Sequence, residues 1–126
     1  MQVLSGSIGG GRTRVDYQVT LHGSDLAVSL TGGEGPHIGA VAIAVPKGPP
    51  PQGATPVATS VYTRAGHHDD KVARPLAETL ARALGVACVA VVGIHMDNAT
   101  RAEIAEAVTN ADLAAREIAN RLAPSV

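Results

Sequence analysis

Apolar residues recur at every second position in several stretches of the chain, a pattern typical of β-strands that bury one face. Two such stretches are separated by the turn at 22–25, which predicts an antiparallel hairpin. Two others are continuous apolar runs, which indicates strands buried on both faces. The predicted strands cover 12–21, 26–30, 40–45, 57–62 and 86–92, and the third and fifth of these are the continuous runs.

Two further segments repeat apolar residues at the spacing of a helix. Asp69 or Asp70 could cap the start of the first helix. Alternatively, the regular helix begins at Pro75, because proline suits a first helical position. The second begins with a capping box formed by Thr100 and Glu103. The predicted order is therefore β-β-β-β-α-β-α.

This order predicts an α+β fold in which one mostly antiparallel sheet is covered by two helices. Residues 1–126 are expected to form a single domain, since no repeat or boundary interrupts the chain. The glycine-rich residues 1–11 are expected to be a flexible lead-in rather than a strand.

The composition indicates a core made of small side chains. The chain is 45% hydrophobic, but it contains no Phe or Trp and only two Tyr residues. Small side chains bury little apolar area each, at ~25 cal/mol per Å². We therefore expect a homodimer, with the functional site close to the subunit boundary.

Charge and cysteine content narrow the class of protein. The net charge is −1, from 10 basic and 11 acidic residues without a basic block, so nucleic acid is not an expected partner. No apolar run approaches the ~20 residues that span a bilayer, so no membrane partner is expected. The lone Cys88 fits a reducing cytosol, and we expect a cytoplasmic protein in which this thiol is an inert part of the core.

The densest group of polar side chains lies within residues 62–71. It comprises Arg64, His67, His68, Asp69, Asp70 and Lys71. One interpretation is a capped helix start, because carboxylates are stabilised near the positive end of the helix dipole. The other is an anion or metal site, because His and Asp are good metal ligands. No spacing such as HExxH or CxxC is present, so the sequence leaves both open.

Two other segments carry histidines that could face this cluster. The glycine-rich turn at 32–39 contains His37 and matches neither GxGxxG nor the Walker pattern. It is either a plain loop or a place where bare backbone amides approach a phosphate or a flat ring. His95 and Asp97 follow the predicted strand 86–92 in a turn, the position where ligands commonly bind in layered α/β structures.

Four motifs in this order resemble a known family. They are GGGRTRVDYQV, GGEGPHIGAVAIA, RAGHHDDKVARPLAETLA and GIHMDNATRAEI. Together they resemble the small D-type subunit of bacterial gallate decarboxylase, the LpdD-like family of prenylated-flavin chaperones. The resemblance implies a non-catalytic partner of a UbiD-type decarboxylase, an enzyme that uses prenylated FMN. It also implies the fold of proteasome assembly chaperones, small α+β units that pair into dimers.

The resemblance assigns candidate roles to residues of this chain. Arg64 and Lys71 are expected at the phosphate, while Ile38 and Met96 would supply an apolar wall for the flavin ring. The cofactor-binding candidates are Gly33, Gly35, His37, Ile38, Gly39, Arg64, His67, His68, Lys71, His95 and Asp97. The candidate ligands of a divalent metal are His37, His67, His68 and His95.

The preferred hypothesis is a maturation factor that binds prenylated FMN, or FMN, without turnover of its own. One alternative is a small metal-dependent enzyme whose His/Asp cluster activates water. Another is a protein-assembly chaperone that binds no ligand, in which the polar cluster is only structural.

Overall fold

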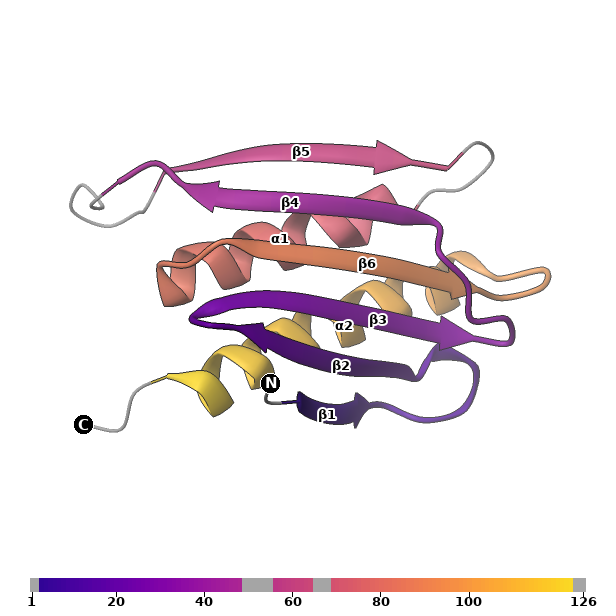
Figure 1. Cartoon of the computed structure of the whole chain (residues 1–126). Coiled ribbons are helices and arrows are strands. Elements are labelled where there is room, and N and C mark those ends of the chain that lie inside the picture. Colours follow the sequence, from indigo (N-terminus) through magenta and orange to yellow (C-terminus); the bar gives the residue numbers. More distant parts are fainter. Residues whose placement is uncertain (1–2, 49–55, 65–68, 124–126) are drawn as a thin grey trace.

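The computed structural model describes residues 3–48, 56–64 and 69–123. These residues form one six-stranded sheet with both helices on the same face (Figure 1). The elements are β1 (Val3–Ile8), the 3-10 helix η1 (Gly11–Thr13), β2 (Val15–His22), β3 (Asp25–Gly33), β4 (Ala40–Pro46), β5 (Val57–Thr63), α1 (Asp70–Leu84), β6 (Cys88–His95) and α2 (Arg101–Leu122).

The strand order in the sheet is β1-β2-β3-β6-β4-β5. β6 lies between β3 and β4, pairing parallel with the former and antiparallel with the latter. The other neighbouring pairs are antiparallel. The prediction of a mostly antiparallel sheet with two helices is therefore confirmed, with one parallel pair that makes the sheet mixed.

The predicted hairpin is present, and its register fixes which side chains face the core. β2 and β3 pair from His22 opposite Asp25 at the turn to Val15 opposite Gly32. Val15, Val19 and Leu30 are fully buried against the helices, because side chains on one face of a strand recur every second residue. The inward residues of both helices complete this core, including Leu80 and Ile118, and none of them is aromatic.

The prediction that residues 1–11 are a flexible lead-in is wrong for the part that the structure describes. Residues 3–8 form β1, which pairs antiparallel with β2 along its whole length. Gly6 lies opposite Tyr17, and a Cβ placed on Gly6 would lie 2.4 Å from the Tyr17 hydroxyl oxygen. The glycine thus makes room for the tyrosine ring. Five strands, rather than four, precede the first helix.

The prediction that residues 40–45 are buried on both faces is also wrong. Ala40, Ala42 and Ala44 point to the helices and are buried, whereas Ile43 is 40% exposed and Val45 is 42% exposed. The reason is that both helices pack on one side, so no helix or strand of the described residues covers the other face of the sheet (Figure 1). The central strand β6 is likewise only half-buried on that face.

The helix ends settle the alternatives that the sequence left open. α1 begins at Asp70 with Pro75 inside it, and it ends at Gly85 in the left-handed conformation. The capping box of α2 is formed by Thr100 and Glu103 as predicted. In the part of the chain that the structure describes, no helix is long and apolar enough to cross a membrane.

Candidate functional site

The described parts of the three polar segments singled out in the sequence meet at one end of the sheet, as predicted. The end of β6, the turn between β3 and β4, and the start of α1 all lie at this end (Figure 1). His37 Nε2 lies 3.4 Å from Asp69 Oδ2, and the rings of His37 and His95 meet edge to face with centroids 6.3 Å apart. Residues distant in the sequence therefore form one polar cluster.

Asp69 is the most buried member of this cluster, at 7% exposure. It stands at the N-cap position of α1, but its side chain makes no capping bond. Instead, its Oδ1 accepts a hydrogen bond from the backbone N–H of Ile94 at 3.0 Å. Asp69 thus occupies the N-cap position, as one interpretation expected, but its carboxylate ties α1 to the end of the central strand instead of making a capping hydrogen bond.

Two of the contacts that hold His37 are of different kinds. Its Nδ1 lies 2.8 Å from the carbonyl oxygen of Gly35. Because a carbonyl only accepts hydrogen bonds, this contact places a proton on Nδ1. Its Nε2 faces the Asp69 carboxylate, so the ring is clamped between the glycine-rich turn and the start of α1.

The glycines of this turn serve the packing of the chain against itself. A Cβ on Gly39 would lie 1.8 Å from Asp69 Oδ2, and one on Gly33 would lie 1.9 Å from the His95 carbonyl oxygen. By contrast, a Cβ on Gly35 would meet only the His95 ring, at 3.7 Å. Two of the three candidate glycines thus lie where protein atoms already fill the space. Their proposed approach to a ligand remains a prediction.

Arg64 and Ile38 lie together on the outer side of the turn. The backbone N–H of Arg64 donates to the Gly39 carbonyl at 2.8 Å, and its Nη1 donates to the Ile38 carbonyl at 3.2 Å. The Arg64 side chain is exposed, and Ile38 is 58% exposed. Part of the guanidinium is therefore occupied in holding the turn.

A network around Arg12 holds the loop that follows β6, and sequence patterns did not reveal it. Arg12 pairs with Glu34 at 2.8 Å and Glu103 at 3.1 Å, and it also donates to the Asp97 carbonyl.

The Asp97 carboxylate lies 2.8 Å from His95 Nε2. His95 lies at the end of β6, so the expectation that it belongs to a turn is wrong.

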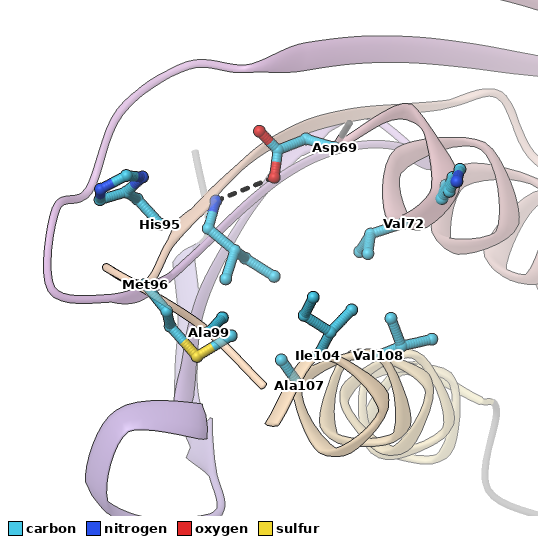
Figure 2. A pocket seen from close by; sticks show the side chains of 10 residues that line it. Asp69, Val72, His95, Met96, Ala99, Ile104, Ala107 and Val108 are labelled. Atoms are coloured by element: carbon cyan, nitrogen blue, oxygen red, sulfur yellow. Dashed lines mark hydrogen bonds between the residues drawn. The ribbon is translucent and has the colours of Figure 1, made fainter. Parts of the chain in front are cut away.

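A cavity of about 400 Å³ lies beside the polar cluster, between α1, α2 and the end of β6. Figure 2 shows Val72 of α1 facing Ile104 and Val108 of α2, with Asp69 and His95 toward the end of the sheet. The lining residues are Asp69, Lys71, Val72, Ile94, His95, Met96, Ala99, Ile104, Ala107 and Val108. The cavity therefore has an aliphatic wall and a polar rim.

Two residues in the apolar wall of this cavity are more exposed than their spacing in the sequence indicates. Ile104 and Val108 keep the helical spacing expected of core residues, yet they are 51% and 43% exposed. Met96 lines the cavity, as expected for a wall residue, whereas Ile38 does not. Among the cofactor-binding candidates that the structure describes, Lys71 and His95 line it.

The four-histidine metal site stays a prediction. His67 and His68 lie outside the described residues. Among the residues that are described, no group of three or more His, Cys, Asp or Glu side chains could hold a metal ion.

Cys88 is buried in the core, and burial raises the pKa of its thiol to about 12, so it is the inert thiol that the sequence predicted.

The fold is an α+β fold of the kind found in a proteasome assembly chaperone. The chain is similar to a chain in the crystal structure of a chaperone complex for yeast 20S proteasome assembly, with a TM-score of 0.60 over 96% of this chain and 94% of the other. The two are 12% identical, so this similarity concerns the fold alone.

Sequence comparison identifies the family. Residues 9–123 match the family described as the prenylated flavin chaperone LpdD-like domain. The chain is also 31% identical over 96 residues to Protein LpdD of Lactiplantibacillus plantarum (strain ATCC BAA-793 / NCIMB 8826 / WCFS1), covering 76% of this chain and 68% of that protein. The chain therefore belongs to the LpdD-like family of prenylated flavin chaperones.

Proposed function

We propose that this protein binds prenylated FMN, or FMN, in the cavity between α1 and α2 and supplies it to a UbiD-type decarboxylase in the cytoplasm. The bound cofactor would provide the decarboxylation chemistry in the partner enzyme, while this chain binds and orients it without turnover. Family membership supports the chaperone role. The observation that carries the ligand assignment is the aliphatic cavity of about 400 Å³ with charged residues at its rim.

The cavity wall suits a prenylated flavin by its chemistry. Ligand sites are concave and mostly apolar, and they commonly measure ~300–1,000 Å³. The isoalloxazine ring presents flat apolar faces, and the prenyl-derived carbons add aliphatic surface to them. Met96, Ile104 and Val108 offer aliphatic contacts for both, which compensates for the lack of Phe, Tyr or Trp among the described residues that line the cavity.

The rim suits the polar part of the same cofactor. Lys71 lines the cavity and supplies a cation for the phosphate. Asp69 would repel a phosphate if its carboxylate faced the cavity alone, but that group accepts from the Ile94 N–H and lies against His37. The Ile94 N–H therefore stabilises part of its negative charge, which lessens the repulsion of a phosphate near Lys71.

Titration of FMN into the purified protein, followed by flavin fluorescence, tests this proposal. Ile104→Asp places a charge on the apolar wall and is expected to weaken binding at least ten-fold. Leu113→Asp is the matched control, because Leu113 is also on α2 and is 43% exposed but does not line the cavity. Equal FMN affinities for the wild type and both variants would show that the flavin binds outside this cavity.

A further inference from the structure

The guanidinium of Arg12 contacts three segments around the cavity, although Arg12 itself does not line it. Arg12 lies in η1, the 3-10 helix between β1 and β2. It pairs with Glu34, just after β3, at 2.8 Å and with Glu103, in the first turn of α2, at 3.1 Å. It also donates to the backbone carbonyl of Asp97, in the loop between β6 and α2. One side chain thus joins three parts of the chain that are far apart in the sequence.

Arg12 and Glu34 together hold both backbone groups of Asp97, an arrangement here called the Asp97 clamp. The N–H of Asp97 donates to Glu34 Oε1 over 3.3 Å, and its carbonyl accepts from Arg12 Nη2. The same Glu34 oxygen accepts from Arg12 Nε at 2.9 Å, so the three residues close a ring of contacts. The backbone N–H of Glu34 also donates to the carbonyl of His95 over 2.7 Å. The loop after β6 is therefore fastened to the turn after β3.

The clamped loop forms part of the cavity wall. Met96 and Ala99, which flank Asp97 and Asn98 in the sequence, both line the cavity (Figure 2). Asn98 has a φ of 52°, in the left-handed region that residues other than glycine adopt less readily. A backbone in such a conformation persists where the surrounding structure holds it. The clamp holds the loop one residue away, at Asp97, and so supports the shape that places Met96 and Ala99 on the wall.

Arg12 also connects this loop to the start of α2. Glu103 Oε2 pairs with Arg12, while Glu103 Oε1 accepts from the N–H of Thr100 in the capping box. The next residue, Ile104, lies on the cavity wall. Because arginine presents its N–H donors in a rigid planar fork, a single side chain can hold the loop and the helix start at a fixed separation. A lysine at this position would keep the charge but not the fork.

We propose that Arg12 and Glu34 are positioning residues of the flavin site, which hold Met96 and Ala99 toward the flavin through the Asp97 clamp without lining the cavity themselves. Their role in flavin binding rests on the function proposed above. The residues that line a ligand site keep their geometry only when residues behind them fix it, so loss of the clamp is expected to weaken binding. Neither Arg12 nor Glu34 belongs to the hydrophobic core, so the fold is expected to survive their replacement.

Amide hydrogen exchange of the ligand-free protein, followed by NMR, tests the clamp itself. Arg12→Ala is expected to speed the exchange of the amides at 97–100 about ten-fold, because the loop opens locally more often. Arg12→Lys should speed it nearly as much, since lysine lacks the planar fork. Arg14→Ala is the matched control, because Arg14 lies two residues away and pairs with Asp16. Unchanged exchange in Arg12→Ala would overturn the proposal, whatever the protein binds.

Titration with FMN, followed by fluorescence anisotropy, tests the consequence for the site. Arg12→Ala and Glu34→Ala are expected to weaken FMN binding about ten-fold and to lower the anisotropy of the bound flavin, because the wall holds the ring less firmly. Glu34→Gln keeps an acceptor oxygen for the Asp97 N–H and should restore most of the affinity. Arg14→Ala should bind FMN as the wild type does.

Two outcomes of this titration separate the positioning role from the proposed function. Faster loop exchange in Arg12→Ala together with wild-type FMN affinity would overturn the positioning role alone. A wild type that binds no FMN would overturn the proposed function, and the role of Arg12 and Glu34 in flavin binding with it. Urea midpoints for Arg12→Ala and Glu34→Ala close to that of Arg14→Ala would show that a loss of affinity does not come from unfolding.

Discussion

The carboxylate of Asp69 accepts a hydrogen bond from the backbone N–H of Ile94 over 3.0 Å, joining the start of α1 to the end of the central strand. Its other oxygen lies 3.4 Å from His37 in the glycine-rich turn. One buried side chain thus connects the three segments around the cavity. Both Asp69 and Ile94 line that cavity, so the same contact fixes part of its shape.

Replacing Asp69 is expected to destabilise the protein. Asp69→Ala leaves the N–H of Ile94 without this acceptor, and a buried group that loses its hydrogen bond costs about 1–3 kcal/mol. Asp69→Asn keeps an acceptor oxygen and should cost less. Urea unfolding measures both, with Asp70→Ala as the control in the first turn of α1. An unchanged urea midpoint for Asp69→Ala would show that this bond contributes nothing to stability.

The glycine-rich turn offers a matched pair of substitutions. Gly39→Ala places a Cβ 1.8 Å from Asp69 Oδ2, whereas Gly35→Ala meets its nearest atom at 3.7 Å. We expect Gly39→Ala to lower the unfolding midpoint strongly, and Gly35→Ala to leave it nearly unchanged. Thermal unfolding compares the two. If both variants are stable and both bind FMN less tightly, the glycines contact the ligand rather than the chain.

The capping box of α2 predicts a specific response to acid. The N–H of Thr100 donates to the Glu103 carboxylate, which lowers the pKa of Glu103 below its ordinary value of 4.5. Because the folded-state pKa is the lower one, the stabilisation is complete above about pH 4.5 and is lost as the pH falls through the folded-state value. Urea midpoints at several pH values should fall less steeply in acid for Glu103→Gln than for the wild type. Identical slopes would rule out this contribution.

The phosphate contact can be isolated by comparing FMN with riboflavin, which lacks the phosphate. Lys71 lines the cavity, so Lys71→Gln is expected to weaken FMN binding about ten-fold, in line with ~1.5 kcal/mol for a charged hydrogen bond, and to leave riboflavin binding unchanged. Arg64→Lys should have a smaller effect, because Arg64 already donates to the Ile38 carbonyl. A larger loss for Arg64→Lys would place the phosphate at the outer side of the turn.

Much of the fold could be predicted because its signals are local. The apolar run around Cys88 marked the central strand, and Thr100 with Glu103 marked the start of α2. The first strand was missed because its middle inward position, between Leu4 and Ile8, is Gly6, whose missing side chain is replaced by the Tyr17 ring from the next strand. A sequence pattern does not display a contact made by another element.

The sequence predicted which segments meet at the candidate site, but it did not predict the cavity or most residues of its apolar wall. The segments carrying His37, Asp69 and His95 were expected to meet, and they do. However, the helical spacing of Ile104 and Val108 does not reveal that they face a cavity, because an apolar stripe looks the same whether it meets another helix or a cavity. Which face of an amphipathic helix stays open is decided by tertiary packing.

The central claim is that the cavity binds prenylated flavin, and the visible absorption spectrum of the purified protein tests it most directly. The wild type and Ile104→Asp would be produced in cells that also make a flavin prenyltransferase. The account predicts that the wild type carries a flavin spectrum at close to one flavin per chain, while the folded Ile104→Asp protein is colourless. A folded but colourless wild-type protein, or equal flavin content in both, would contradict it.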